Sequence, residues 1–280
     1  MTLLGAAQIR ELAAALDLKP SKSLGQNFVI DSNVCTKIVR IAAVGPTDIA
    51  LEIGPGLGSL TLALLDSAAS VVAVEIDSRL AGQLPITVAN HFEYPENLTV
   101  LNQDALSIQS LPVNPTVLVA NLPYNVSVPV LLHLLEKFGS LRTGVVMVQA
   151  EVADRLAAKP GTKEYGIPSV KAAWWAEVKG AGSVSRSVFW PAPNVDSKLV
   201  SFTRRQTPGD EVLRRKVFTI IDAAFAQRRK MLRSALSGLY GSSSSAEEIL
   251  KRADIDPTLR GEALEISSFC AIAAVAPDIF

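Results

Sequence analysis

The fold is decided by the stretch Ile49-Ala50-Leu51-Glu52-Ile53-Gly54-Pro55-Gly56-Leu57-Gly58. Its first half is an apolar run of strand length, and its second half is a glycine turn that leads into a helical pattern over residues 59–69. The same alternation continues outward from this stretch. Strands are predicted at 71–76, 98–101, 116–120 and 144–149, and helices at 78–90 and 128–138. Strands that alternate with helices indicate βαβ units and therefore an α/β fold with a mostly parallel sheet.

The glycine turn favours a cationic cofactor. Gly54, Gly56 and Gly58 have the spacing G-x-G-x-G, whereas dinucleotide sites use G-x-G-x-x-G. Glycines let a ligand approach the backbone closely, and the Glu52 carboxylate beside the turn suits a positive charge better than a pyrophosphate. We therefore predict S-adenosylmethionine, which carries an ammonium and a sulfonium. A dinucleotide and a purely structural turn remain alternatives.

Two acidic residues stand where the next strands end. Glu75 follows the glycines by roughly twenty residues, the position from which a carboxylate accepts hydrogen bonds from ribose hydroxyls. Asp104, after the strand at 98–101, is placed to accept a hydrogen bond from the adenine amine of the cofactor. The alternatives are a solvated carboxylate at Glu75 and a helix N-cap at Asp104.

The most specific motif is Asn121-Leu122-Pro123-Tyr124, between the strand at 116–120 and the helix at 128–138. The N6 amine of adenine is a poor nucleophile because its lone pair is delocalised into the ring. The side-chain oxygen of Asn121 and the carbonyl of Leu122 would accept its two hydrogens and orient it for methylation, while Tyr124 stacks on the base. An Asn-Pro turn with a core tyrosine is the alternative.

Phe189 provides the second predicted wall for the target base. A base that is modified must leave its stack, and aromatic surfaces offset part of that cost. Core packing is the alternative for Phe189 and still more for the adjacent Trp190. Residues 184–190 and 197–203 alternate like strands and are predicted to pair at the sheet edge.

The charge is distributed unevenly along a chain that is neutral overall. Residues 41–140 contain nine acidic and two basic residues, whereas residues 204–233 contain nine basic and three acidic ones. The break at 206–210 separates a predicted domain 1–206 from helices expected at about 210–226, 229–238, 246–253 and 262–275. This asymmetry predicts a cofactor-binding domain followed by an RNA-binding α-helical domain at 207–280, with ordinary solvated surfaces as the alternative. The residues predicted to contact RNA phosphates are Arg214, Arg215, Arg228, Arg229 and Lys230.

The composition indicates a folded protein of the cytoplasm. Hydrophobic residues make up 49% of the 280 residues and charged residues 19%. Cys35 and Cys270 lie far apart and form no CxxC motif, as expected in a reducing compartment. Residues 105–135 contain no Asp, Glu, Lys or Arg but are interrupted by four prolines, so they are not expected to span a membrane. No signal peptide and no metal site are predicted.

Together these motifs resemble the ribosomal RNA adenine N6,N6-dimethyltransferases, specifically the bacterial enzymes that act on 16S RNA. The resemblance runs from about Lys22 to at least Leu236. Beyond the motifs above, it includes Gln26-Asn27-Phe28, Gln103-Asp104-Ala105, Phe189 to Ser197 and Gln227 to Leu232. The sequence departs from the family pattern at Val29, where leucine is usual, and in the segment Trp190 to Pro193.

The resemblance implies a class I methyltransferase architecture: a Rossmann-like, seven-stranded sheet with one antiparallel strand, and a helical C-terminal domain. It implies that Gln26, Asn27 and the backbone of Val29 close over the cofactor. Its substrate would be two adjacent adenosines in a hairpin loop near the 3′ end of 16S RNA within the small ribosomal subunit. Each would be dimethylated by a monomeric enzyme that takes part in ribosome biogenesis.

Three other interpretations remain open at the level of sequence. A large-subunit RNA methylase has overlapping motifs, although residues 191–193 and the helical tail are closer to the small-subunit enzymes. A ribosome-assembly or transcription factor could keep the fold only to bind RNA. A dehydrogenase is disfavoured by the glycine spacing.

Overall fold

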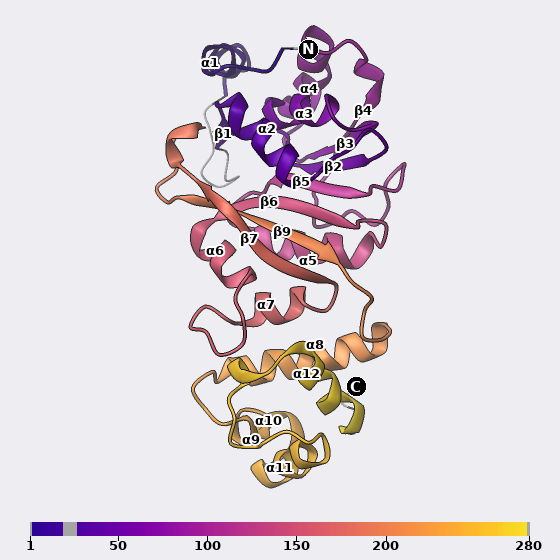
Figure 1. Cartoon of the computed structure of the whole chain (residues 1–280), viewed down its shortest axis with the longest axis vertical. Helices are drawn as coiled ribbons and strands as arrows, with labels where there is room; N and C mark the ends of the chain where they lie inside the picture. The colour runs from indigo at the N-terminus through magenta and orange to yellow at the C-terminus, as the bar shows by residue number, and fades with distance from the viewer. Residues whose placement is uncertain (1, 19–26, 279–280) are drawn as a thin grey trace. The chain divides into compact units, whose positions relative to one another are not determined.

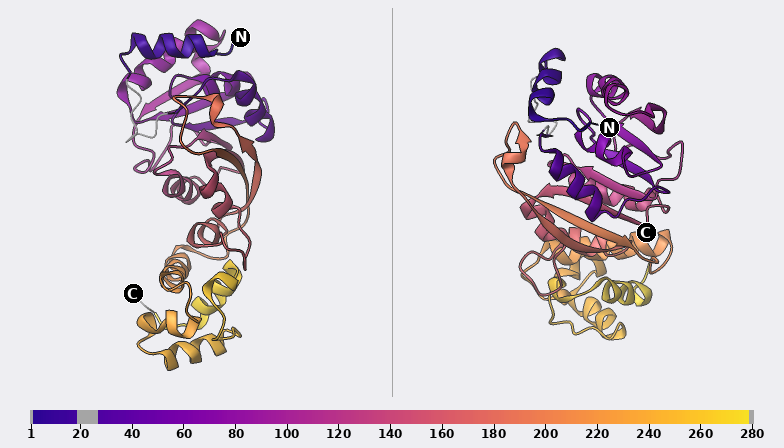
Figure 2. Two further views of the ribbon diagram at one scale, coloured as in Figure 1. Left: turned by 90° about the vertical axis from the view of Figure 1, so that its left-hand side faces the viewer. Right: turned by 45° about the horizontal axis from the view of Figure 1, so that its top comes forward.

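The computed structural model describes residues 2–18 and 27–278. A seven-stranded sheet has the order β4-β3-β2-β5-β6-β9-β7, and helices lie on both of its faces (Figures 1 and 2). The seven strands are β2 (Ile49–Ile53), β3 (Ser70–Glu75), β4 (Leu98–Asn102), β5 (Val117–Asn121), β6 (Thr143–Gln149), β7 (Ala176–Val184) and β9 (Ser197–Arg204).

The first five of these strands run parallel, as predicted. β2 lies between β3 and β5 and pairs with both in parallel, and β4 and β6 extend the sheet on either side. The chain therefore passes from β2 outward through β3 to β4 and then crosses to the other side of β2. The strand order reverses between β2 and β5, and in open α/β sheets ligands bind outside the carboxyl ends of the strands at such a point.

Local sequence explains the helices that cover the sheet. Helix α2 (Ser32–Ile41) is capped by Asp31, whose side chain accepts from the Asn33 amide at 2.9 Å. Asp77 caps α4 (Ser78–His91) in the same way. The remaining helices near the sheet are α1 (Ala6–Ala15), α3 (Ser59–Leu65), η1 (Pro95–Asn97), α5 (Ser127–Lys137) and α6 (Ala150–Leu156). The seven-stranded, mostly parallel sheet with helices on both faces confirms the predicted class I methyltransferase fold.

The predicted edge pair of strands is wrong in its details. The seventh strand is β7 (Ala176–Val184), and β9 lies inside the sheet, between β7 and β6, to which β9 runs antiparallel. The expected strand at 184–190 breaks because the Ser185 hydroxyl accepts from the Ser187 amide and starts a 3-10 turn, η2 (Arg186–Val188). Only β8 (Phe189–Trp190) remains extended, and it pairs with β1 (Phe28–Val29) in a separate two-stranded sheet.

The chain divides into two compact units, which we describe separately. The first comprises residues 1–153 and 179–204, and the second residues 154–178 and 205–280. The sequence predicted two domains, 1–206 and 207–280, and this division stays a prediction. The compact units differ from it because residues 154–178 group with the C-terminal helices and not with the sheet.

The second unit is built around α8 (Glu211–Ala226), whose N-cap Asp210 accepts from the Leu213 amide at 2.9 Å. Its buried side includes Val217, Ile220 and Ile221. The other helices are α7 (Ile167–Ala172), α9 (Leu232–Ala235), α10 (Ser237–Tyr240), α11 (Ser243–Arg252), η3 (Gly261–Ala263) and α12 (Ile266–Val275). No helix of the described residues is long and apolar enough to cross a membrane.

The basic stretch after α8 is a turn and not the predicted helix. Residues 227–231 connect α8 to α9. The amide of Leu232 donates to the Leu259 carbonyl at 2.7 Å, and that of Arg233 donates to the Pro257 carbonyl. These tertiary hydrogen bonds satisfy the first amides of α9, which therefore begins without a helical turn before it.

Candidate active site

A cavity of about 210 Å³ lies in the first unit, where β2, β3 and β5 end. It is lined by eight of the residues predicted to bind the cofactor or the target base: Asn27, Val29, Gly54, Gly56, Glu75, Asp104, Asn121 and Pro123. Parallel strands bring the six residues from Gly54 to Pro123 together because their carboxyl ends meet at one edge of the sheet, whereas Asn27 and Val29 come from β1 and the residue before it. Gln26 lies outside the described residues.

The glycine turn forms one wall of the cavity with its backbone. Gly54, Gly56 and Gly58 have φ angles of +67°, +58° and +99°, a backbone conformation that residues with a side chain rarely adopt. A Cβ atom on Gly56 would also lie 3.0 Å from the Phe28 ring. The turn therefore requires glycine for its conformation and for the space in front of it.

Glu75 is held beside this turn by the backbone. The carboxylate accepts from the Gly56 amide at 3.2 Å and from the Asp77 amide at 3.0 Å, one bond to each oxygen. Only 5% of the residue is exposed. Burial raises the pKa of Glu75, and the two amide bonds oppose this rise. An acceptor is thus fixed on the cavity wall that the cofactor ribose was predicted to contact.

Glu52 is a second buried carboxyl group on the cavity wall. It is 1% exposed, and the Thr61 hydroxyl donates to it at 2.6 Å. Burial raises its pKa from the ordinary 4.5 to about 8; the Thr61 hydrogen bond lowers the pKa, while the neighbouring Glu75 charge raises it. From the sequence, the Glu52 carboxylate was placed beside the glycine turn, but Glu52 was not predicted as a cofactor-binding residue.

Asn121 ends β5 with its two side-chain polar atoms in different situations. Its amide nitrogen donates to the Asn27 carbonyl at 3.1 Å. Its side-chain oxygen Oδ1 is buried and has no hydrogen-bond partner among the described residues. A buried acceptor without a partner is costly, so this atom is available for a donor from a ligand.

Asp104 and Val29 line the cavity, and each also accepts a hydrogen bond from another residue of the protein. Asp104 is exposed, and its Oδ1 accepts from the Leu106 amide at 2.9 Å. This is the local capping contact considered as the alternative for this residue. The Val29 carbonyl accepts from the buried Ser59 hydroxyl at 2.7 Å, which fixes β1 to α3.

The two predicted aromatic walls do not line the cavity. The Tyr124 hydroxyl lies 2.6 Å from the Ser197 hydroxyl, and burial raises the pKa of Tyr124. Phe189 is 3% exposed and stands opposite Val29 in the β1–β8 pair. The aromatic ring that does line the cavity is Phe28. It was missed as a site residue because a strand as short as β1, of two residues, shows no periodicity in the sequence.

Leu122 is held by the sheet. Its side chain is buried, and its amide donates to the Met147 carbonyl at 3.0 Å. The following Pro123 carbonyl accepts from the Val126 amide and closes the turn before α5. The positions of Asn121 and Pro123 at the cavity therefore follow from hydrogen bonds on either side.

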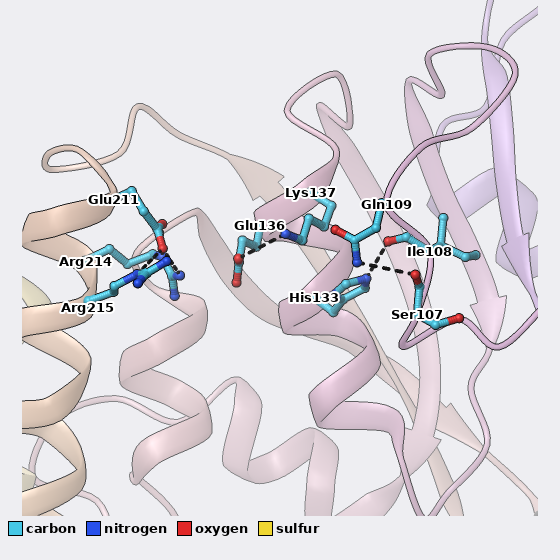
Figure 3. Close-up of polar contacts among 9 residues, drawn as sticks. All are labelled: Ser107, Ile108, Gln109, His133, Glu136, Lys137, Glu211, Arg214 and Arg215. Atoms are coloured by element: carbon cyan, nitrogen blue, oxygen red, sulfur yellow. Dashed lines mark hydrogen bonds and ion pairs between the residues drawn. The ribbon is translucent and has the colours of Figure 1, made fainter.

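The predicted RNA-contacting residues of the second unit fall into two groups. Arg214 and Arg215 converge on Glu211 (Figure 3), and the Arg214 guanidinium also lies over the Trp175 ring, 5.5 Å from its centre. The ion pairs lower the pKa of Glu211 to about 2. With a side chain only 13% exposed, Arg214 is largely committed to these contacts.

Arg228, Arg229 and Lys230 differ although they are consecutive. Arg228 forms an ion pair with Glu262 at 2.7 Å and donates to the Lys163 carbonyl. Arg229 and Lys230 are exposed, and no side-chain ion pair involves them among the described residues. Of the three, the last two are thus positioned to meet a polyanion.

The cavity suits S-adenosylmethionine. The glycine backbone leaves room for close approach, Glu75 offers acceptor oxygens held by two backbone amides, and Asn121 offers a buried acceptor with no partner among the described residues. In agreement with this chemistry, the sequence profile of the ribosomal RNA adenine dimethylases matches residues 18–277. The chain belongs to the ribosomal RNA adenine dimethylase family.

Individual dimethylase relatives cover nearly the whole chain. A ribosomal RNA small subunit methyltransferase A from Streptomyces avermitilis is 58% identical over 97% of this chain and 93% of its own. The protein of the same name from Kineococcus radiotolerans is 56% identical over 99% of this chain and 92% of its own.

Solved structures agree on the dimethylase fold. A dimethyladenosine transferase from Plasmodium falciparum has a TM-score of 0.73 at 24% identity and covers 86% of this chain and 94% of its own. The 23S rRNA methyltransferase ErmE has a TM-score of 0.66 at 25% identity, over 89% of this chain and 99% of its own. The predictions of a methyltransferase enzyme and of S-adenosylmethionine as methyl donor are confirmed by the family.

Proposed function

We propose that this dimethylase transfers methyl groups to N6 of two adjacent adenosines in a hairpin loop near the 3′ end of 16S RNA, within the small ribosomal subunit. The small-subunit assignment is supported by the names of relatives at 56–58% identity. The enzyme acts as a monomer in the cytoplasm and contributes to ribosome biogenesis. The observation that carries the chemistry is the buried, unpartnered Oδ1 of Asn121 at the cavity.

The cofactor would be held by groups that already line the cavity. Glu75 would accept from the ribose, Asp104 from the adenine amine, and the backbone of Gly54 and Gly56 would lie against the methionine portion. Gln26 and Asn27 would complete the site from the segment before β1. When bound, S-adenosylmethionine supplies a methyl group made electrophilic by the adjacent sulfonium.

Asn121 and Leu122 would orient the target amine. The Asn121 Oδ1 atom and the Leu122 carbonyl accept its two hydrogens, and this localises the nitrogen lone pair toward the methyl group. Tyr124 would support the base by stacking. Phe189 is only 3% exposed, so it would have to move to offer the base a second face. Asn121 to Tyr124 contains no carboxylate or histidine, so catalysis would rest on alignment and hydrogen bonding. The S–CH3 bond would break as the N–CH3 bond forms, S-adenosylhomocysteine would leave, and the methylated amine would then lose its proton to water.

RNA would reach this site through electrostatic contacts of the second unit. Arg229 and Lys230 are the strongest candidates because their charges are exposed. Arg215, whose side chain is 69% exposed, adds a third charge. Arg214 and Arg228 would contribute mainly by supporting the local structure that presents these residues.

The test is transfer of labelled methyl groups to undermethylated small ribosomal subunits, followed by mapping of the modified bases. We expect N6,N6-dimethyladenosine at two adjacent positions near the 3′ end of 16S RNA. The Asn121→Ala variant should bind the cofactor more weakly and lose most of its turnover. Methylation of large-subunit RNA alone would favour the alternative methylase, and the absence of dimethyladenosine would refute the proposal.

A further inference from the structure

The stretch from Phe189 to Ser197 ends in a buried serine, Ser197. Ser197 is the first residue of β9, stands opposite Gln149 of β6, and has an exposed fraction of 0%. A buried hydroxyl costs free energy unless it forms a hydrogen bond. The partner that satisfies it therefore indicates why a polar residue stands at this position.

That partner is the Tyr124 hydroxyl, at 2.6 Å from the Ser197 Oγ atom. The main chain of Tyr124 belongs to the turn closed by the hydrogen bond from the Val126 amide to the Pro123 carbonyl. The tyrosine is thus held at both ends, by the turn at its backbone and by Ser197 at the far tip of its ring. With both ends held, the direction of the long axis of the ring is defined, and so is the place of the ring.

A defined ring position matters for a residue that stacks on a base, whereas the stacking itself needs no hydroxyl. Phenylalanine offers the same aromatic face to a base as tyrosine does. Burial raises the pKa of Tyr124, so its hydroxyl stays neutral and acts as a hydrogen-bonding group. The hydroxyl is then explained by the contact with Ser197, because small errors in the position of a reacting base are costly in rate.

We infer that Ser197 is a positioning residue, which holds the Tyr124 ring in the place required to stack on the target adenine. The inference rests on the proposed role of Tyr124 as the stacking residue. Ser197 connects this ring to β9, and through the register of β9 with β6 to the centre of the sheet. The strand after the Phe189 segment thereby supports the residue that faces the base.

The experiment compares Ser197→Ala, Tyr124→Phe and the double variant in methyl transfer to undermethylated small subunits. Each single variant should lower kcat about tenfold, the effect expected for the loss of one hydrogen bond. The double variant should be no slower than either single variant, because both remove the same bond. KM for the subunit and the calorimetric Kd for S-adenosylmethionine should stay unchanged.

Three further variants serve as controls. Ser197→Thr keeps the hydroxyl and should retain activity, whereas Ser197→Cys keeps the size, has only a weak hydrogen-bonding group and should not. Ser201→Ala removes a hydroxyl from the same strand, where it contacts the Lys179 carbonyl, and should leave kcat unchanged. These comparisons separate positioning from a general loss of packing around β9.

The inference is overturned if Ser197→Ala has full turnover, if the two single effects multiply in the double variant, or if cofactor affinity falls with kcat. The Tyr124→Ala variant tests the underlying proposal by itself. Full activity in that variant would remove the stacking role of Tyr124 and the inference with it. A strong loss in Tyr124→Ala beside a fully active Ser197→Ala would overturn the inference alone.

Discussion

Replacing Glu52 by glutamine should make the unliganded protein more stable, and increasingly so as the pH rises. Burial holds the pKa of Glu52 at about 8, compared with 4.5 for an ordinary glutamate. Below pH 4.5 the carboxyl group is protonated in both the folded and the unfolded chain. As the pH rises from 4.5 to 8, the unfolded chain ionises while the folded one keeps its proton, so wild-type stability falls.

The magnitude follows from the width of this pH window. Each pH unit is worth about 1.4 kcal/mol, so at pH 7 the buried carboxyl destabilises the fold by about 3 kcal/mol. Glutamine keeps a group that can contact Thr61 and does not titrate. The stability difference between Glu52→Gln and wild type should therefore grow by about 3 kcal/mol between pH 5 and pH 7.5, or about 6 °C in Tm for a chain of this size.

The assay is thermal unfolding of both proteins over this pH range, with Glu96→Gln as the control because Glu96 is exposed. The difference in stability between Glu96→Gln and wild type should not grow comparably with pH. A constant difference between Glu52→Gln and wild type would refute the reasoning, since it would mean that Glu52 titrates as it does in the unfolded chain. The variant should also bind S-adenosylmethionine more weakly, as expected when a functional site is maintained at a cost in stability.

Further predictions concern the glycine turn and the basic turn of the second unit. Gly56→Ala should abolish cofactor binding in calorimetry, because a φ of +58° strains alanine and its Cβ would lie 3.0 Å from the Phe28 ring; wild-type affinity would contradict the role of the turn. Replacing Arg229 and Lys230 together by alanine should weaken binding to the small subunit and reduce the slope of log affinity against log salt by roughly two. An unchanged slope would exclude both from phosphate contacts. Arg228→Ala should lower Tm, because its carboxylate and carbonyl partners lose their donor; an unchanged Tm with weaker RNA binding would reverse this assignment.

The cavity was predictable because its chemistry follows from where strands end. Glu75, Asp104 and Asn121 each stand at or just after the end of a parallel strand, and the glycine turn follows another. In a parallel sheet these ends converge, so linear positions suffice to bring the residues together. The prediction needed neither the angles between the helices nor the packing of the core.

The errors arose where tertiary contacts override local preference. The strand β7 contains Gly180 and Gly182 and lies at the sheet edge, so it shows little of the apolar pattern that marks a strand. Arginine and lysine favour helices, yet residues 227–231 form a turn because the start of α9 bonds to the loop around Leu259. The role of Arg228 could not be predicted either, since its partner Glu262 lies 34 residues away.

The pairing of β1 with β8 has a consequence for the synthesis of the protein. Phe28, which lines the cavity, lies opposite Trp190, 162 positions later in the chain. A nascent chain that has reached Gln149 already contains the glycine turn, Glu75, Asp104 and Asn121, but it lacks the strand against which β1 lies. Contacts so distant in sequence form slowly. The growing polypeptide therefore cannot complete its methyl-donor pocket until more than two thirds of it has been translated.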